Sequence, residues 1–245
     1  MKKIGVVIGL LVMIVMSGCV KQPEIPKYHF NKSDRIGYVI EPSGNVYHSH
    51  MGTTIFNNYD QELSYSWTLE KDIQKALGKN VKRSMINLRK HGISSNDIKD
   101  MIVAENGKWV VKKEASYKKL FNELHLKAVL LVSQEDTYVS TGRDPIVMKS
   151  SGIASHSLLG LDRYFAVSAY QYNLYLLKPD AVVRVDNVQR SEIIYDTLLT
   201  EFQEKSGFKK PVDDEKMTQK ELNSVKKKVI QYIDEGAAAT NQHIK

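Results

Sequence analysis

The chain has one cysteine, Cys19, among its 245 residues. A single thiol excludes a disulfide within the chain, so the fold must be stabilised by its hydrophobic core. Several catalytic signatures are also absent: the HExxH zinc pattern, the GxSxG turn of serine hydrolases and the GxGxxG phosphate-binding loop. The sequence motifs therefore assign no catalytic residue, no metal site and no cofactor, and we expect a non-enzymatic protein.

Long apolar segments are scarce, and the longest lies near the N-terminus. It covers the 13 residues 4–16, whereas a helix needs about 20 apolar residues to cross the hydrocarbon core of a membrane. Two lysines precede this run, and Ser17-Gly18-Cys19 follows it. Basic residues, a short apolar core and small residues before a cut site are typical of a secretory signal peptide. We expect residues 1–18 to be this signal peptide.

The four residues Met16-Ser17-Gly18-Cys19 resemble the cleavage box of bacterial lipoproteins, although Leu is more common than Met at the first position. The resemblance implies that Cys19 becomes the first residue of the mature chain and carries a diacylglycerol and a further acyl chain such as palmitate. Such an anchor is effectively permanent, since each buried methylene contributes about 0.8 kcal/mol. The alternatives are a buried thiol and an uncleaved membrane anchor.

Localisation follows from the same resemblance. Val20, rather than Asp, comes after the lipidated position. In a cell with two membranes this implies attachment to the outer membrane, with the protein facing the periplasm. We therefore expect a lipid-anchored protein of the cell envelope.

The basic residues are only slightly in excess. Removal of the signal peptide takes away Lys2 and Lys3 and lowers the formal net charge from +7 to +5. This balance does not indicate a nucleic-acid partner. The densest basic run, residues 226–228, is flanked by Val225 and Val229, which favours the solvated face of a helix over a patch for lipid headgroups.

The mature chain divides into a tether, a domain and a tail. Residues 19–33 are polar and contain Pro23 and Pro26, which predicts a flexible tether. We expect a single domain over residues 34–236. Residues 237–245 are small and polar, and we expect a disordered tail.

Hydrophobic periodicity predicts alternating strands and helices. The expected strands cover residues 35–41, 81–88, 128–132, 163–177 and 181–185, and the expected helices cover residues 67–77, 94–104, 116–124, 191–205 and 218–235, with a polar loop or hairpin tip over 135–151. We place a helix cap at Ser66 or Thr68. This order predicts an α/β (α+β) sandwich in which helices pack on one mixed β-sheet.

The order of these elements is similar to that of envelope domains related to the amino-terminal domain of TolB. Lipoprotein activators of peptidoglycan synthases and the curli secretion channel subunit share this shape. The resemblance covers about residues 33–206 and rests on element order and long paired strands. It implies a partner-binding domain, although a fold alone does not assign a function.

Two clusters have residue types that occur in catalytic or metal sites. His48 and His50 are two residues apart, which places both imidazoles on one face of a strand and could begin a zinc site. No third ligand accompanies them in the sequence, so we expect no bound metal. Ser155 and His156 are adjacent, and on a strand they point to opposite faces, so they do not form a nucleophile and its base.

The segment from Gly52 to Asn58 is the strongest candidate for partner binding, through Gly52, Thr53, Thr54, Phe56, Asn57 and Asn58. The alternative is that its Thr and Asn side chains satisfy the backbone of their own loop. A tyrosine-rich strand offers a similar choice between core packing and an aromatic platform, and core packing is favoured; its tyrosines are Tyr164, Tyr170, Tyr172 and Tyr175.

These observations favour a lipid-anchored envelope protein that acts as a binding or adaptor domain. Its expected partner is another envelope protein or a peptidoglycan-associated component. Two alternatives remain open: a subunit of an oligomeric outer-membrane secretion or transport assembly, and an envelope hydrolase. A barrel-forming subunit would need strands of about ten alternating residues, whereas the run over 163–177 has polar residues in its middle.

Overall fold

The computed structural model describes residues 28–106, 108–111, 114–142, 144–177, 180–185, 190–199, 201, 206–211 and 217–244. The signal peptide, Cys19 and most of the predicted tether lie outside these residues. Within them the strands form two five-stranded sheets and two short ribbons. No helix in this part of the chain is long and apolar enough to span a bilayer.

The first sheet has the strand order β13-β12-β7-β1-β4 and the second has the order β14-β11-β10-β2-β3. The first consists of β13 (Asp180–Arg184), β12 (Tyr170–Leu177), β7 (Leu126–Gln134), β1 (Arg35–Ile40) and β4 (Met85–Asn87). The second consists of β14 (Ser191–Asp196), β11 (Leu161–Val167), β10 (Gly152–Leu158), β2 (Asn45–Met51) and β3 (Tyr59–Ser66). Both sheets mix parallel and antiparallel pairs.

The ribbons and helices complete the fold. The ribbons pair β5 (Ile102–Glu105) with β6 (Lys108–Val111), and β8 (Thr137–Val139) with β9 (Ile146–Met148). The helices are α2 (Glu70–Asn80), α3 (Ser95–Met101), α4 (Glu114–Glu123) and α6 (Gln219–Gln242), with the short 3-10 turns η1 (Ile55–Asn57) and η2 (Leu88–His91).

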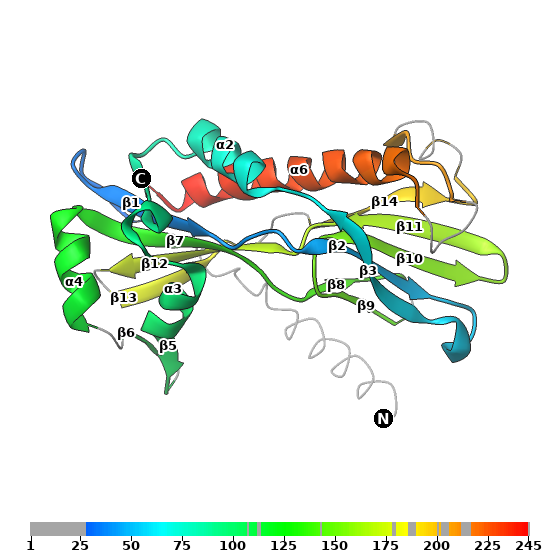
Figure 1. Cartoon of the computed structure of the whole chain (residues 1–245), viewed down its shortest axis with the longest axis horizontal. Helices are drawn as coiled ribbons and strands as arrows, with labels where there is room; N and C mark the ends of the chain where they lie inside the picture. The colour runs from blue at the N-terminus through cyan, green and yellow to red at the C-terminus, as the bar shows by residue number, and fades with distance from the viewer. Residues whose placement is uncertain are drawn as a thin grey trace, which may run out of the picture.

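The two sheets lie end to end and give the molecule an elongated shape (Figure 1). The chain passes directly between them where β1 leads into β2 and where β11 leads into β12. Helices α2 and α6 lie side by side along one face, and α6 extends over strands of both sheets (Figure 1). The expected fold class, mixed β-sheet with helices packed on it, is confirmed, and the strands divide between two sheets where we expected one.

The division occurs at Ser168-Ala169, inside the run that we predicted as one strand. The Ala169 N–H donates to the Ser151 Oγ at 2.9 Å, and the Glu135 N–H donates to the Ala169 carbonyl at 2.9 Å. These bonds satisfy the backbone at the point where the chain leaves β10 as its partner and takes β7 instead. Hydrophobicity alone does not mark this change of partner, because both strands are buried.

The main hydrophobic cluster lies between the sheets and helices α2 and α6. Helix α6 begins at a capping box formed by Thr218 and Glu221. It buries one face over its whole length, as far as Thr240. The helix therefore continues through residues that we placed in a disordered tail over 237–245, because Ala237 packs in the core and Ile244 is also buried.

Two other predicted helices are corrected. The expected helix over 191–205 begins instead as strand β14, which pairs with β11 along the edge of the second sheet; residues 200 and 202–205 lie outside the described part. The expected helix over 94–104 ends at Met101, and the chain continues as β5, whose turn to β6 starts at Asn106 with φ +50°. In both cases strand pairing overrides a local helical pattern.

Helix α2 also begins later than expected and lacks the predicted cap. Its N-cap residue is Leu69, whose side chain makes no capping bond. Ser43, from the connection between β1 and β2, supplies the missing acceptor: its Oγ accepts from the Leu69 N–H at 2.8 Å. The cap therefore comes from a residue 26 positions away in the chain, which a local motif search does not find.

Two helical glycines give a matched test of the packing of α6 on the first sheet. A Cβ on Gly236 would lie 2.3 Å from the Tyr172 ring, and that ring is fixed because its hydroxyl donates to the Ile233 carbonyl at 3.0 Å. We expect Gly236→Ala to lower the free energy of unfolding by about 1–3 kcal/mol, as overpacking does. In α2, Gly78 has open space around it, so Gly78→Ala should raise that free energy by about 1 kcal/mol. Urea denaturation of both variants measures the difference, and equal effects would contradict it.

Candidate functional site

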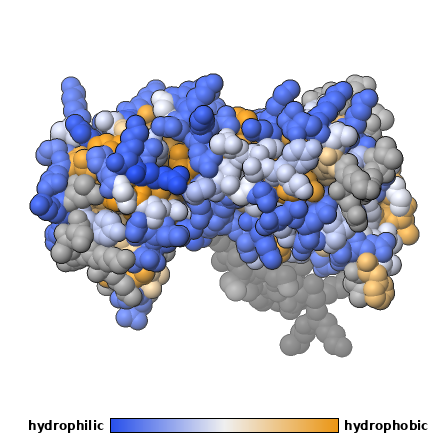
Figure 2. Space-filling model, in the orientation of Figure 1, coloured by the Kyte–Doolittle hydropathy of each residue, from blue (hydrophilic) through white to orange (hydrophobic). Residues whose placement is uncertain are grey.

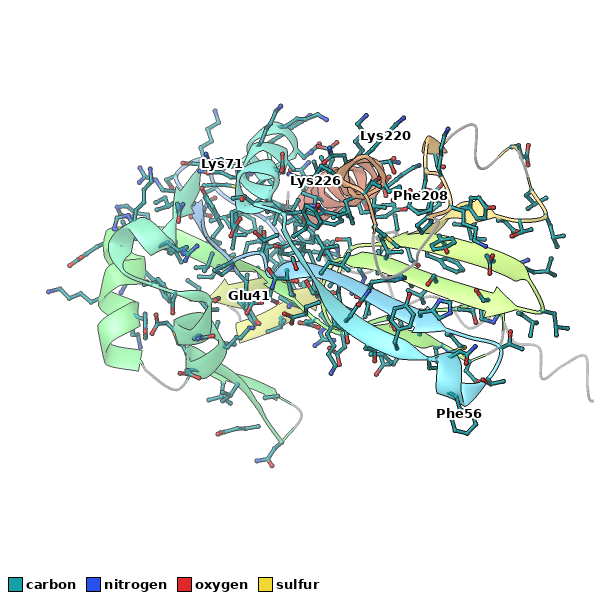
Figure 3. The ribbon with its side chains drawn as sticks, turned by 45° about the vertical axis from the view of Figure 1, so that its right-hand side comes forward. Glu41, Phe56, Lys71, Phe208, Lys220 and Lys226 are labelled. Carbon is teal, nitrogen blue, oxygen red and sulfur yellow. The ribbon has the colours of Figure 1, made fainter. Side chains whose placement is uncertain are left out.

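Exposed apolar side chains gather at the end of the second sheet that lies farthest from the first. Three turns meet there: the loop between β2 and β3, the turn between β10 and β11, and the residues after β14 (Figure 1). We define the apolar tip as the five side chains Phe56, Leu159, Leu161, Leu198 and Leu199, which are 90%, 83%, 41%, 61% and 42% exposed. Figure 3 shows Phe56 on η1, pointing away from the body of the molecule.

Hydrogen bonds fasten the three turns to one another. The Thr53 Oγ1 donates to the Ser157 carbonyl at 3.4 Å and accepts from the Leu159 N–H at 3.3 Å. On the other side, the Thr197 N–H donates to the Asp162 carbonyl at 3.0 Å, and the Asp162 N–H donates to the Thr197 Oγ1 at 2.9 Å. The three turns that carry the apolar tip are therefore connected to one another by hydrogen bonds.

The loop predicted to bind a partner divides its residues between two roles. Its polar side chains hold the loop: the Gly52 N–H donates to the Asn58 Oδ1 at 2.9 Å, and the Thr54 Oγ1 donates to the Asn57 Oδ1 at 3.3 Å. Phe56 is 90% exposed. The leucines of the tip were not predicted as binding residues: Leu198 lies in the segment that we predicted as a helix over 191–205, and Leu159 lies in a turn that no sequence pattern identified.

Leu159 has an unusual backbone conformation for its residue type. Leu158 pairs with Leu161 across the turn, so Leu159 and Gly160 are its two central residues, and both have positive φ, +51° and +80°. This is the requirement of a type I′ turn, in which Asn-Gly is preferred. A leucine at such a position costs about 1–2 kcal/mol, and its exposed side chain recovers none of that cost by packing inside the domain.

Charged groups next to the tip are paired with one another. The Asp162 carboxylate accepts from Ser157 and forms an ion pair with Lys210. Burial by itself would raise the pKa of Asp162, but the hydrogen bonds from Lys210 and Ser157 bring that pKa below its ordinary value. Arg163 and Asp196 form a second pair, with Nε and Oδ2 2.7 Å apart. The electrostatic field of these groups is therefore largely cancelled at the tip.

A polar cluster lies deeper in the same sheet, around Ser155. Its Oγ is 2.8 Å from the His48 Nε2 and 2.7 Å from the His50 Nδ1. Since a hydroxyl donates only one hydrogen bond, at least one of the two imidazoles must donate to it. Tyr59 stacks on the His50 ring, with centroids 4.9 Å apart. His48, His50 and Ser155 are 0%, 8% and 1% exposed.

The histidine pair lies on one strand face as predicted, and its partner is Ser155 from β10. His156 points to the other face, as the alternation along a strand requires. Among the described residues no group of three His, Cys, Asp or Glu side chains could hold a metal ion. The cluster satisfies buried polar groups, and the serine became visible only once the parallel register of β2 and β10 placed it opposite His50.

A shallow cavity of about 330 Å³ lies beside β2 and β3. Its lining includes Ser49, Met51, Asp60 and the start of β9. Ser49 and Met51 point to the sheet face opposite to His48 and His50, because successive residues of a strand alternate. His50 and Tyr59 also line the cavity, whereas Ser155 does not and is 1% exposed.

No family model, curated protein or solved structure matches this chain.

The role of Ser155 can be tested through stability. We expect Ser155→Ala to lower the free energy of unfolding by about 1–3 kcal/mol, because two buried imidazoles lose their common partner. Ser64→Ala, at an exposed position of β3, is the matched control and should have little effect. Thermal unfolding measures both, and a neutral Ser155→Ala variant would show that the cluster adds nothing to the fold.

The backbone cost of Leu159 gives a prediction of opposite sign. Leu159→Asn creates the Asn-Gly pair that a type I′ turn prefers, so it should raise the free energy of unfolding by about 1 kcal/mol. The same change at Leu161, which has no positive φ among the described residues, should give no such gain. Calorimetry of the two variants tests the difference, and a destabilised Leu159→Asn protein would contradict this account of the turn.

Proposed function

We propose that this chain is an exported lipoprotein, anchored to a membrane through Cys19, whose domain binds another component of the cell envelope through the apolar tip. The observation that supports a binding role is the position of the tip, at the end of the molecule opposite to the entry of the chain. Large apolar side chains exposed together on one surface are typical of interaction sites. Here Phe56, Leu159 and Leu198 are mostly exposed.

The entry point of the chain is well defined. The Tyr28 N–H donates to the His243 carbonyl at 3.4 Å, next to the C-terminal end of α6. From Arg35 the chain runs through β1 and β2 towards the tip (Figure 1). These 17 residues span up to about 55 Å at the rise of an extended strand. A partner at the tip is thus held far from the anchored end.

A binding role also agrees with the chemistry of the interior. Ser155 has imidazole nitrogens within hydrogen-bonding distance, as a nucleophile requires. It is nevertheless only 1% exposed, and it is not part of the lining of the cavity beside His50. These features favour a non-enzymatic domain over the hydrolase alternative.

The lipid anchor is tested by replacing the cysteine. Cys19→Ser removes the only thiol of the chain, so the protein should be released from the membrane fraction of the exporting cell by a carbonate wash, which strips contacts other than a covalent lipid anchor. Ser33→Ala, in the predicted tether, should leave the protein in the membrane fraction. Retention of the Cys19→Ser protein after a carbonate wash would show that another part of the chain holds it there.

A further inference from the structure

We propose that the apolar tip inserts into a lipid bilayer, and that this bilayer is different from the one that holds Cys19. The first statement depends only on the tip. The second rests on the proposed function, because it requires the lipid anchor at the other end of the domain. The protein would then connect two membrane surfaces.

The shape and composition of the tip favour a bilayer over a pocket on another protein. Its side chains project from three turns at the end of a sheet, so the surface is convex. It consists of one phenylalanine and four leucines, whereas the residues that dominate protein interfaces are Trp, Tyr and Arg, with Leu under-represented. Phe and Leu are the side chains that enter the boundary between headgroups and acyl chains. Figure 2 shows hydrophobic colour at this end of the molecule, away from the hydrophilic helical face.

Polar groups in the loops of the tip have hydrogen-bond partners within the protein, which favours their transfer to an apolar medium. Residues 52–58 and 157–161 contain no charged side chain. Their polar groups bond to one another, as in the contacts from Gly52 to Asn58 and from Leu159 to Thr53. Desolvating a polar group is costly only where it lacks a hydrogen-bond partner. Insertion of these loops therefore carries a small desolvation cost.

The conformation of Leu159 supports the same conclusion. This residue adopts a left-handed backbone that a leucine adopts only at a cost. Strain of this kind is concentrated at functional sites. The exposed Leu159 side chain adds no stability by packing within the domain. Its burial in a bilayer would offset the cost of its backbone conformation.

The length of the tether identifies which bilayer is involved. All five tip side chains enter a membrane together only when the domain stands on this end. The entry of the chain lies beside the C-terminal end of α6, whose 24 residues alone extend over about 36 Å, and the tip lies beyond the other end of this helix (Figure 1). The nine residues from Cys19 to Lys27 extend over at most about 32 Å. The lipid on Cys19 cannot reach back to the surface that holds the tip, so it belongs to a second bilayer.

The charges near the tip predict how binding depends on the lipid. Asp162 and Asp196 are paired with Lys210 and Arg163, and Glu201 follows the last leucines of the tip. This surface has no excess of positive charge. Binding should therefore be the same for zwitterionic and anionic vesicles, and the same at about 0.1 M and about 0.5 M salt, where screening differs greatly.

The direct test uses the chain from Val20 to Lys245, without signal peptide or Cys19. All three hydrophobic clusters are formed by residues between Phe30 and Ile244, so this chain retains them. It should float with phosphatidylcholine vesicles in a density gradient. Phe56→Ser and Leu159→Asn should each lower the partition coefficient about tenfold, since each removes a large apolar side chain from the bilayer.

Two features of the design separate binding from folding. Leu159→Asn is expected to be more stable than the parent chain, so its loss of binding cannot be attributed to unfolding. Tyr138→Ser is the matched control: Tyr138 is an aromatic residue that is 67% exposed and lies on β8, outside the tip. This variant should float as the parent does. Equal flotation of all variants, or no flotation of the parent chain, would overturn the proposal.

A second measurement identifies the bilayer. Lipidated protein on one set of vesicles should capture a second, differently labelled set, and Phe56→Ser should abolish the capture. If the chain without Cys19 floats with vesicles but the lipidated protein does not capture the second set, the tip enters the same membrane as the anchor. That outcome would overturn the bridging statement. If the tip binds a protein and the chain does not float with vesicles, the binding partner of the tip is a protein pocket and the bilayer proposal is wrong. Retention of the Cys19→Ser protein after the carbonate wash rejects the lipoprotein proposal and leaves the flotation result standing.

Discussion

The junction between the two sheets is the constraint on which the rest of the structure depends. Ser43 lies there and connects three elements: its Oγ accepts from the Leu69 N–H at the start of α2, contacts the Glu70 carboxylate at 3.1 Å and accepts from the Tyr170 hydroxyl at 3.1 Å. Burial raises the pKa of Tyr170 to about 12, so this phenol remains a donor. The bonds tie the connection from β1 to β2 to the start of α2 and to β12, at the point where the chain passes from the first sheet to the second.

Much of the first sheet could be predicted from the sequence, and the reasons are physical. The apolar run around Val129 and Leu131 indicates a central strand, and β7 is the middle strand of the first sheet. Strand β10 was not predicted, because most of its residues between Gly152 and Leu158 are small or polar, and Ile153 is the one large apolar residue among them. It is held by close approach: a Cβ on Gly152 would lie 1.9 Å from the Tyr47 carbonyl oxygen. This close approach depends on how β10 pairs with β2, and local sequence patterns do not predict the pairing of strands that are far apart in the chain.

The same distinction applies to the candidate site. Phe56 could be named from the sequence, because it lies in a loop segment rich in Gly, Thr and Asn. Leu159 and Leu198 could not be named, since leucine in a sequence normally indicates a core. His48 and His50 were correctly placed on one face, but their role depends on Ser155, more than a hundred residues away. A buried hydroxyl between two imidazoles is a property of the fold, with no signature in the chain.

The straight path of the chain from Arg35 to Met51 has a mechanical consequence. Tension between the tether and the tip would act along β1 and β2, parallel to their axes. The hydrogen bonds from β1 to β4 and β7 lie across that direction, so they would be loaded together and would have to break together. Helix α6, which packs over both sheets, would share the load at the junction. The domain is therefore built to resist extension along its length, as a strut does.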